Sequence, residues 1–301
     1  MTLSATAQRR IATALSAHES LVVGTDNAEL TPLLPDGLFQ MIYIDPPFNT
    51  GKRQKRVSTT TARSATGDRV GFSGERYDTT ITAMAAYDDV FADYWAFLAP
   101  RLEEAWRLLT PTGTLYLHLD YREVHYAKVL LDHLFGRECF LNELIWIYDY
   151  GAKAKNKWPA KHDNILVYVK DPKNYYFDSA TVDREPYMAP GLVTTEKAAL
   201  GKRSTDSWWH TIVSPTGKEK TGYPTQKPEG IIRRMVSASS RPGDYVLDFF
   251  AGSGTLGAVA AKLDRSYVLA DSNPEAIEVM KRRLKPLGPV TFVIPRVHTI
   301  T

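Results

Sequence analysis

Short apolar runs recur along the chain, separated by stretches with helical periodicity. Several of these runs are continuous rather than alternating, which is typical of strands covered on both faces. We expect strands at Leu21–Gly24, Met41–Asp45, Thr114–Asp120, Glu143–Tyr148, Ile165–Lys170, Tyr245–Phe250 and Tyr267–Asp271. Apolar spacings of three and four predict helices over Val90–Leu109, Tyr121–Phe135, Glu229–Ser239, Thr255–Leu263 and Pro274–Leu284. The alternation predicts an α/β fold with a mostly parallel sheet.

Two segments interrupt this alternation. Residues 51–88 form a long polar insertion, and residues 172–222 are irregular and rich in Gly, Pro, Thr and Lys. Long loops in a compact domain tend to be functional, and each segment follows a strand, so we expect both at the functional edge of the sheet. We therefore expect one domain, residues 1–301, that carries two insertions.

A glycine turn joins the strand at Tyr245–Phe250 to the helix at Thr255–Leu263. Its residues 252–257 spell G-x-G-x-x-G, and Asp271 closes the next strand 19 positions after Gly252. Alone, this pattern fits a dinucleotide site, so an NAD-dependent oxidoreductase has to be considered. A tight turn without a ligand is the plain structural alternative. Because only 44 residues follow Gly257, most of the sheet must lie upstream, and the strand order must be rearranged.

A second motif, Asp45-Pro46-Pro47-Phe48, ends the strand at Met41–Asp45. A bare Asp-Pro-Pro triplet is more often a capped turn than a functional site. Two prolines fix the backbone at the point where a carboxylate leaves the sheet, because each proline restricts its own φ and the residue before it.

Basic residues are concentrated in two segments, although the whole chain has a net charge of only +3. Residues 52–76 carry seven basic groups against two acids, and residues 153–173 hold six lysines against two acids. Solvated loops are the ordinary explanation for such runs. Two of them on a nearly neutral chain also suit a surface that faces phosphates.

The single cysteine, Cys139, excludes an intramolecular disulfide framework and cysteine-cluster zinc sites. The histidines have no metal-ligand spacing, so we expect no metal. No stretch approaches the roughly 18 apolar residues of a membrane span, and the first twenty residues lack the apolar core of a secretory signal. These features favour a reducing cytoplasm and no membrane association.

Taken together, the motifs resemble those of the beta class of S-adenosylmethionine-dependent DNA amino-methyltransferases, including type III modification subunits. In that class the catalytic Asp-Pro-Pro-aromatic motif precedes the cofactor loop, here Phe250–Gly254, and a Thr-Gln-Lys-Pro element, here Thr225–Pro228, lies ahead of that loop. The resemblance covers about residues 20–285. It implies a Rossmann-like methyltransferase fold in circularly permuted order, with loop insertions for DNA.

The resemblance also implies roles for individual residues. S-adenosylmethionine, which leaves as S-adenosylhomocysteine, is expected to contact Asp26, Thr225, Lys227, Asp248, Phe250, Ala251, Gly252, Gly254, Thr255 and Asp271. Within this set, Asp271 is expected to bind the ribose hydroxyls of the cofactor. Lys227 is expected to bind the cofactor carboxylate, and Asp26 is expected to contact the adenine moiety of the cofactor. The catalytic residues are expected to be Asp45, Pro46, Pro47 and Phe48.

The Asp45 motif suits methylation of a base amino group. Acceptors aimed at the two amino hydrogens favour a pyramidal nitrogen whose lone pair points at the methyl donor. The Asp45 carboxylate and the Pro46 carbonyl are the expected acceptors, and Phe48 is expected to stack on a base that has been flipped out of the duplex. An aspartate at this position favours adenine N6, while cytosine N4 is the alternative within the class.

DNA is the expected partner. The 51–88 insertion is expected to face DNA, and residues 172–222 are expected to recognise the target sequence. The expected phosphate contacts are Lys52, Arg53, Lys55, Arg56, Lys155, Lys157 and Lys161. The resemblance suggests a homodimer and leaves a restriction partner open. A DNA-binding protein that has lost catalysis is the remaining alternative, and the intact motifs argue against it.

Overall fold

The structure, a computed structural model, describes residues 3–49, 93–149, 154–214 and 217–295, and the backbone of strands at 54–63, 69–70 and 76–87. The chain divides into two compact units. The first comprises Met1–Pro46 and Trp95–Thr301, and the second comprises Pro47–Tyr94. None of the helices in the described ranges is long and apolar enough to cross a membrane.

Nine of the described strands form one sheet in the order β11-β7-β8-β6-β2-β12-β13-β1-β14. Only β8 runs antiparallel to its neighbours in this sheet, so the predicted mostly parallel sheet is confirmed. The order is also permuted, because the early strand β2 lies beside the late strand β12. The strands are β1 (Leu21–Val23), β2 (Phe39–Ile44), β6 (Leu109–Leu119), β7 (Phe140–Ile147), β8 (His162–Val169), β11 (Ser207–Trp209), β12 (Tyr245–Asp248), β13 (Ser266–Ala270) and β14 (Thr291–Val293).

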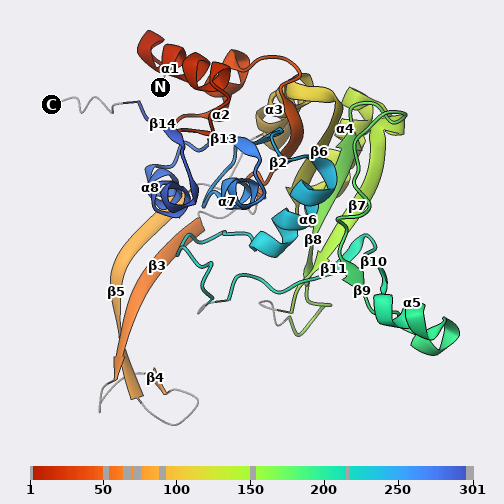
Figure 1. The fold of residues 1–301 in the computed structure, drawn as a ribbon. Coiled ribbons are helices and arrows are strands. Elements are labelled where there is room, and N and C mark those ends of the chain that lie inside the picture. The colour runs from red at the N-terminus through yellow and green to blue at the C-terminus, as the bar shows by residue number, and fades with distance from the viewer. Residues whose placement is uncertain are drawn as a thin grey trace. The chain divides into compact units, whose positions relative to one another are not determined.

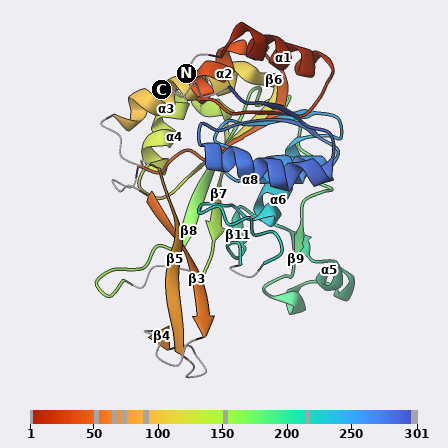
Figure 2. The ribbon, with the colours of Figure 1, turned by 90° about the vertical axis from the view of Figure 1, so that its left-hand side faces the viewer.

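Helices cover both faces of this sheet. In Figure 1, α6, α7 and α8 lie against one face, while α3 and α4 lie on the other, and Figure 2 shows the same arrangement from the side. A short helix, α2, follows β1, and α1 begins at a Ser4 cap. The helices are α1 (Ala5–Ser16), α2 (Asn27–Leu30), α3 (Tyr94–Leu108), α4 (Val124–Phe135), α6 (Glu229–Ser239), α7 (Thr255–Lys262) and α8 (Pro274–Leu284).

The hydrogen bonds of two tyrosine hydroxyls show which helix covers each face of the sheet. Tyr116 on β6 forms a 2.7 Å hydrogen bond with Ser239 of α6. Tyr168 on β8 donates a 2.6 Å hydrogen bond to Asp132 of α4. Because successive side chains of a strand point to opposite faces, every second residue of β6 and β8 faces α6, and the others face α4. This alternation decides which polar residues can meet at the edge of the sheet.

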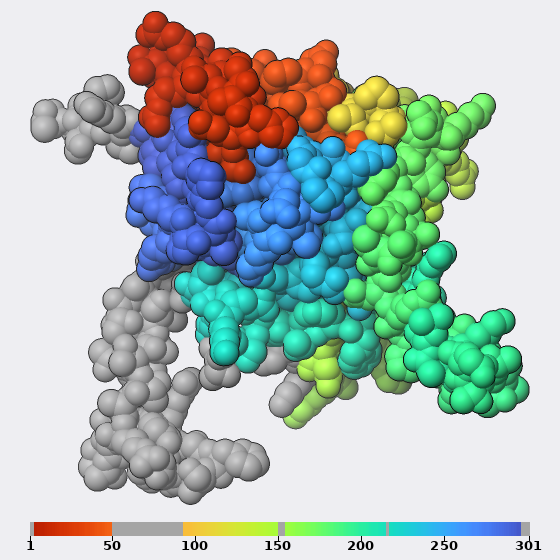
Figure 3. Space-filling view, viewed as in Figure 1, coloured from red at the N-terminus to blue at the C-terminus, as the bar shows by residue number. Residues whose placement is uncertain are grey.

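Residues 172–222, expected to be irregular, contain several short elements. The pair β9 (Arg184–Glu185) and β10 (Lys202–Arg203) encloses the short helix α5 (Thr195–Leu200). This part of the first unit lies at its periphery in Figure 3, and it exposes Met188 and Leu192. Strand β11, which the sequence did not predict, then adds to the sheet beside β7.

The second unit contains a three-stranded antiparallel sheet in the order β3-β5-β4. Its strands are β3 (Gln54–Arg63), β4 (Arg69–Val70) and β5 (Arg76–Tyr87). The sequence predicted only a polar insertion here. The many threonines explain the difference, since threonine is polar in composition but β-branched and favourable in strands.

The neighbours Trp208 and Trp209 have opposite environments. Trp208 is buried, donates its indole N–H to the Thr205 carbonyl at 2.8 Å, and lies under the Arg234 guanidinium. The Trp209 side chain is exposed. Trp208 is therefore a core residue.

We predict that Trp208→Ala lowers the free energy of unfolding by about 3 kcal/mol, because it leaves a large cavity. Trp209→Ala, the matched control, should change it by less than about 0.5 kcal/mol. Urea denaturation followed by circular dichroism measures both. Equal losses in the two variants would contradict the assigned environments.

Candidate active site

Acidic residues gather where the parallel strands end. The residues at or just after the carboxyl ends of β1, β2, β6, β12 and β13 are Asp26, Asp45, Asp120, Asp248 and Asp271. These ends form one edge of the sheet, which is where α/β proteins bind ligands. Burial raises the pKa of Asp248 well above its usual value, and the charges of Asp45 and Asp271 raise it further. The structure thus brings three carboxyls from the predicted set together.

The glycine turn between β12 and α7 needs its glycines for conformation and for space. Gly252 and Gly254 have φ angles of 49° and 70°, in the left-handed region. A Cβ on Gly254 would lie 2.7 Å from Cγ of Met280, and one on Gly252 would lie 3.1 Å from the Tyr223 ring. Gly254 also precedes the first residue of α7 without a side-chain cap, so the amide groups of that first turn can bind an anion.

Asp271 ties this turn to the end of β13. Its Oδ2 accepts the Gly252 N–H at 2.8 Å, and its Oδ1 accepts the Asn273 N–H at 2.8 Å. Burial raises the pKa of Asp271, while these two hydrogen bonds oppose the rise. On the β12 side, Asp248 accepts the Phe250 N–H, and Ala251 donates its N–H to the Ala270 carbonyl. The predicted cofactor loop is thus held by the two acids that flank it.

Asp45 lies at the centre of this edge. Its Oδ2 forms an ion pair with the Lys227 ammonium, and both side chains are largely buried. Its Oδ1 is buried and accepts no hydrogen bond from the described residues. The His118 imidazole lies near Oδ1, with its Nδ1 4.0 Å away. Lys227, expected to meet the cofactor carboxylate, therefore contacts the catalytic candidate itself.

The segment that carries Lys227, residues 219–228, folds over the glycine turn. Gln226 accepts hydrogen bonds from the backbone and hydroxyl of Thr221 and donates to the Glu219 carbonyl. The Lys227 carbonyl accepts the Thr255 hydroxyl at 3.2 Å. Thr225, another predicted cofactor ligand, is exposed in the turn of this segment. The Thr-Gln-Lys-Pro element is thus fixed to the first residue of α7.

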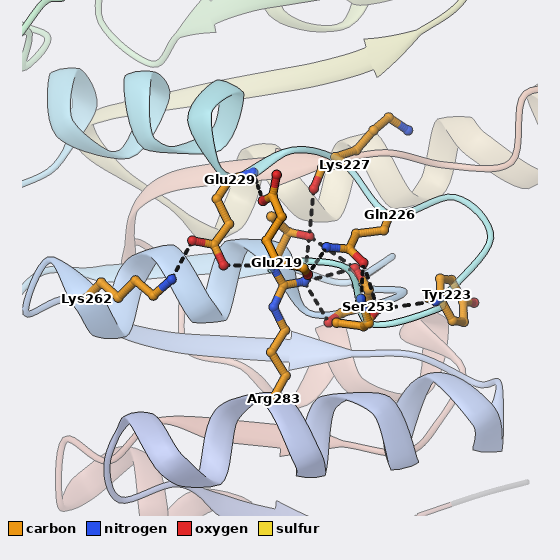
Figure 4. Close-up of polar contacts among 10 residues, drawn as sticks. Glu219, Tyr223, Gln226, Lys227, Glu229, Ser253, Lys262 and Arg283 are labelled. Carbon is orange, nitrogen blue, oxygen red and sulfur yellow. Dashed lines mark hydrogen bonds and ion pairs between the residues drawn. The ribbon is translucent and has the colours of Figure 1, made fainter. Parts of the chain in front are cut away.

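Arg283 on α8 connects this segment to the turn, a role that no sequence pattern indicates (Figure 4). Its guanidinium donates to the carbonyl and hydroxyl of Ser253 at 3.3 and 3.2 Å, and to the Thr255 hydroxyl at 3.0 Å. It also pairs with Glu229 at 2.9 Å. Burial alone would raise the pKa of Glu229, but its contacts with Lys262 and Arg283 outweigh burial and lower it.

Asp26 has a local structural role at the far side of the edge. It caps α2 by accepting the Ala28 N–H at 2.9 Å, and it pairs with Arg101 at 3.1 Å. The same guanidinium also contacts the neighbouring Asn27, whose amide donates to the Phe249 carbonyl. About half of the Asp26 side chain is exposed, so its expected contact with the cofactor stays a prediction.

The remaining predicted residues are distributed over both units. Pro46 ends the first stretch of the first unit, while Pro47 and Phe48 belong to the second unit, where Tyr94 donates to the Pro47 carbonyl at 2.8 Å. Lys52 and Arg53 lie outside the described residues, and Lys55 and Arg56 lie on β3. In the first unit, Lys155 and Lys157 are exposed and Lys161 is half-buried.

We predict that Arg283→Met weakens binding of S-adenosylmethionine at least about tenfold, because charged hydrogen bonds are worth roughly 1.5–3 kcal/mol and the turn loses three. Isothermal titration calorimetry measures the affinity. Arg282→Met is the matched control, since Arg282 is exposed on the same helix and should leave the affinity unchanged. Equal affinities for both variants would show that Arg283 does not hold the turn.

Comparison with known proteins bears on this site. Residues 39–282 match the DNA methylase family. The chain is 39% identical over 284 residues to the type II methyltransferase M2.DpnII of Streptococcus pneumoniae, which covers 89% of this chain and 90% of that protein. It is 30% identical over 274 residues to the DNA adenine methyltransferase YhdJ of Escherichia coli (strain K12), covering 88% of this chain and 82% of that protein.

A solved structure agrees in fold. The crystal structure of the M1.HpyAVI–SAM complex gives a TM-score of 0.55 at 20% identity and covers 88% of this chain and 99% of that chain. The family match spans β2, the glycine turn and Arg282, and so includes nearly the whole acidic edge. These findings confirm a DNA methyltransferase, as the motifs indicate. The chain belongs to the DNA methylase family.

Proposed function

We propose that this protein transfers a methyl group from S-adenosylmethionine to the exocyclic N6 of a flipped-out adenine, at specific sites in DNA. One observation carries the proposal. Asp45 Oδ1 is a buried acceptor that no described residue satisfies, at the edge of the sheet that also holds the glycine turn. A buried acceptor of this kind costs free energy unless a ligand donates to it, and an amino group is such a donor.

The acidic edge fits S-adenosylmethionine. Asp45, Asp248 and Asp271 interact electrostatically, and a ligand with a sulfonium and an ammonium group suits them. The uncapped first turn of α7, with Lys227, would hold the carboxylate of the methionine moiety. When bound, this cofactor supplies a methyl group whose carbon–sulfur bond breaks as the new nitrogen–carbon bond forms.

The other predicted cofactor contacts follow from the same arrangement. The backbone of Gly252–Gly254 would face the methionine moiety, and the remaining lone pairs of Asp271 would accept ribose hydroxyls. Asp26 would lie beside the adenine moiety of the cofactor. These assignments rest on the motifs and on the position of each residue at the edge.

The competing use of the glycine turn by NAD is disfavoured. A pyrophosphate carries two negative charges, and it would lie beside the carboxyls of Asp45, Asp248 and Asp271. Like charges held close together in a partly buried site repel strongly. S-adenosylmethionine, with a sulfonium beside its reacting carbon, an ammonium on its methionine moiety and no pyrophosphate, suits this site better.

Asp45 is proposed to position the base. Its two oxygens have separate tasks, because Oδ2 pairs with Lys227 while Oδ1 is left to accept one amino hydrogen. The Pro46 carbonyl is proposed to accept the other hydrogen. The prolines fix both acceptors before the base arrives, and alignment of this kind can contribute about 7–11 kcal/mol to catalysis. Phe48 is proposed to stack on the base.

Adenine is the proposed base because Asp45, rather than a serine, begins the motif. The name of the relative YhdJ, a DNA adenine methyltransferase, supports this choice. Methylation of cytosine N4 is the alternative. The permuted strand order, with β2 ahead of the glycine turn in the chain, supports assignment to the beta class.

DNA contacts are proposed for the basic segments and for residues 172–222, within a single catalytic domain 1–301 that carries insertions at 51–88 and 172–222. Trp158 is almost fully exposed between Lys157 and Lys161, so this loop offers both charge and a stacking surface. Homodimerisation, a restriction partner and a cytoplasmic location remain predictions.

The direct test is methylation of DNA by the purified protein with radiolabelled S-adenosylmethionine, followed by nucleoside analysis. We expect N6-methyladenine, and N4-methylcytosine would establish the alternative. Asp45→Asn should reduce the rate more than about 100-fold, because the amide is a weaker and uncharged acceptor. Cofactor affinity should change little, and an Asp45→Asn enzyme with full activity would contradict the proposed role.

Removal of Lys155 and Lys157 should weaken DNA binding for all sequences alike. Each lost phosphate contact reduces the salt dependence of binding by about 0.9 in log–log slope, so we expect a reduction of roughly two in Lys155→Ala/Lys157→Ala. Fluorescence anisotropy over a range of salt concentrations measures the slope. Arg9→Ala/Arg282→Ala removes the same charge from α1 and α8, and an equal change there would refute a specific role for the two lysines.

A further inference from the structure

A buried polar cluster lies directly behind Asp45, and none of the sequence motifs includes it. Its centre is His118 on β6, which is fully buried. His118 Nε2 lies 3.2 Å from Asp163 on β8, and its Nδ1 lies 2.8 Å from the Tyr43 hydroxyl on β2. The Tyr148 hydroxyl donates to the other oxygen of Asp163 at 3.0 Å.

The sheet creates this cluster. Tyr43 pairs with Tyr116 in the register of β2 and β6, and His118 is two residues further along the same face. Asp163 lies on β8 two residues before Ile165, the partner of His118. All three side chains therefore point to the face that carries α6, and they meet at the edge where Asp45 leaves β2.

The hydrogen bonds define the protonation of the ring. A carboxylate accepts, so the His118 nitrogen facing Asp163, Nε2, carries a hydrogen. Burial alone would raise the pKa of Asp163, but its hydrogen bond with His118 and the nearby positive charge of Lys227 lower it overall. Burial raises the pKa of Tyr43 well above its usual value, so that hydroxyl keeps its proton and can donate to Nδ1. Nδ1 is then the ring nitrogen without a hydrogen, which accepts from Tyr43 and lies 4.0 Å from Asp45 Oδ1.

Methylation of an amino group releases a proton, so the reaction requires a group that can accept it. The base nitrogen that gains a methyl group has to lose one of its two hydrogens as a proton. Asp45 Oδ1 is placed to take it, but a protonated Asp45 cannot position the next base in the same way. Lys227 on Oδ2 opposes that protonated state as well, because the ion pair requires a carboxylate.

We infer that His118, held by Asp163, takes this proton from Asp45 and so serves as the proton acceptor of the reaction. The inference rests on the proposed methyl transfer. The proton passes from the base nitrogen to Asp45 Oδ1 and then to His118 Nδ1, as the Tyr43 hydroxyl turns its own hydrogen away and accepts the new ring N–H. One N–H bond breaks as an O–H bond forms, that O–H bond breaks as the ring N–H bond forms, and no electrons are exchanged. The products are a neutral methylated base, the Asp45 carboxylate and an imidazolium.

The surroundings favour the imidazolium once it forms. It lies between the carboxylates of Asp163 and Asp45, 3.2 and 4.0 Å from its two nitrogens. The 4.0 Å separation has to shorten by about 1 Å for the transfer, which is within reach of a side-chain rotation. The titratable groups that face the cluster from its neighbouring strands and segments are Tyr43, Asp45, Asp120, Tyr148, Asp163, Lys227 and Asp248.

The test is the pH–rate profile of His118→Gln, whose amide can still donate to Asp163 but cannot accept a proton. We expect kcat to fall at least about tenfold and the acid limb of the profile to disappear, because the protonated ring causes that limb. The KM for DNA and the calorimetric affinity for S-adenosylmethionine should stay within about twofold. His125→Gln, on the exposed face of α4, is the control and should behave as wild type.

Two further measurements complete the test. In wild type, ¹⁵N NMR of histidine-labelled protein should show the His118 ring titrating at the midpoint of the acid limb. Asp163→Asn keeps the proposal testable if His118→Gln does not fold, and it should move that midpoint to lower pH, since the imidazolium loses its carboxylate. An unchanged profile in either variant overturns the inference. A wild-type protein that transfers no methyl group to DNA overturns the proposed function instead.

Discussion

The pairing of β2 with β12 is the contact on which the active site depends. Its register joins Met41 to Val246 and Ile42 to Leu247, about two hundred positions apart in sequence. Because the strands are parallel, their last residues emerge side by side, with Asp45 on one and Asp248 and the glycine turn on the other. A slip of a single residue would turn each buried side chain to the opposite face and move Asp45 away from the turn.

The charged groups around the junction of β2 and β12 pair with side chains of opposite charge or with backbone amides. Asp271 and Asp248 are occupied with backbone amides of the turn, Lys227 neutralises one oxygen of Asp45, and Arg283 joins the turn to Glu229. The rigid parts of the edge are therefore satisfied within the protein. Asp45 Oδ1 accepts no hydrogen bond from the described residues, and it is the acceptor that the proposed reaction uses. Such preorganisation lets a site act without first rearranging its own dipoles.

Much of this arrangement follows from the sequence. Buried strands and amphipathic helices were predicted within a few residues, because burial imposes clear patterns on chains such as Met41–Asp45 and Glu229–Ser239. Strands β11 and β14 were missed because three residues carry too little pattern. The contacts of Lys227, Arg283 and His118 could not be predicted, since each depends on which distant element becomes a neighbour. Trp208 and Trp209 are identical in type, but as successive residues of β11 they point to opposite faces of the sheet, so one is buried and the other is exposed.

Strand β8 has the opposite direction to β6 and β7, between which it lies. A reversed strand delivers its opening residues, rather than its closing ones, to the edge where its neighbours finish. That is why Asp163, the second residue of β8, stands beside groups that conclude β2 and β6. Because β8 runs opposite to its neighbours, it brings the Asp163 carboxylate to this site from a part of the chain that contains neither the glycine turn nor the proline motif.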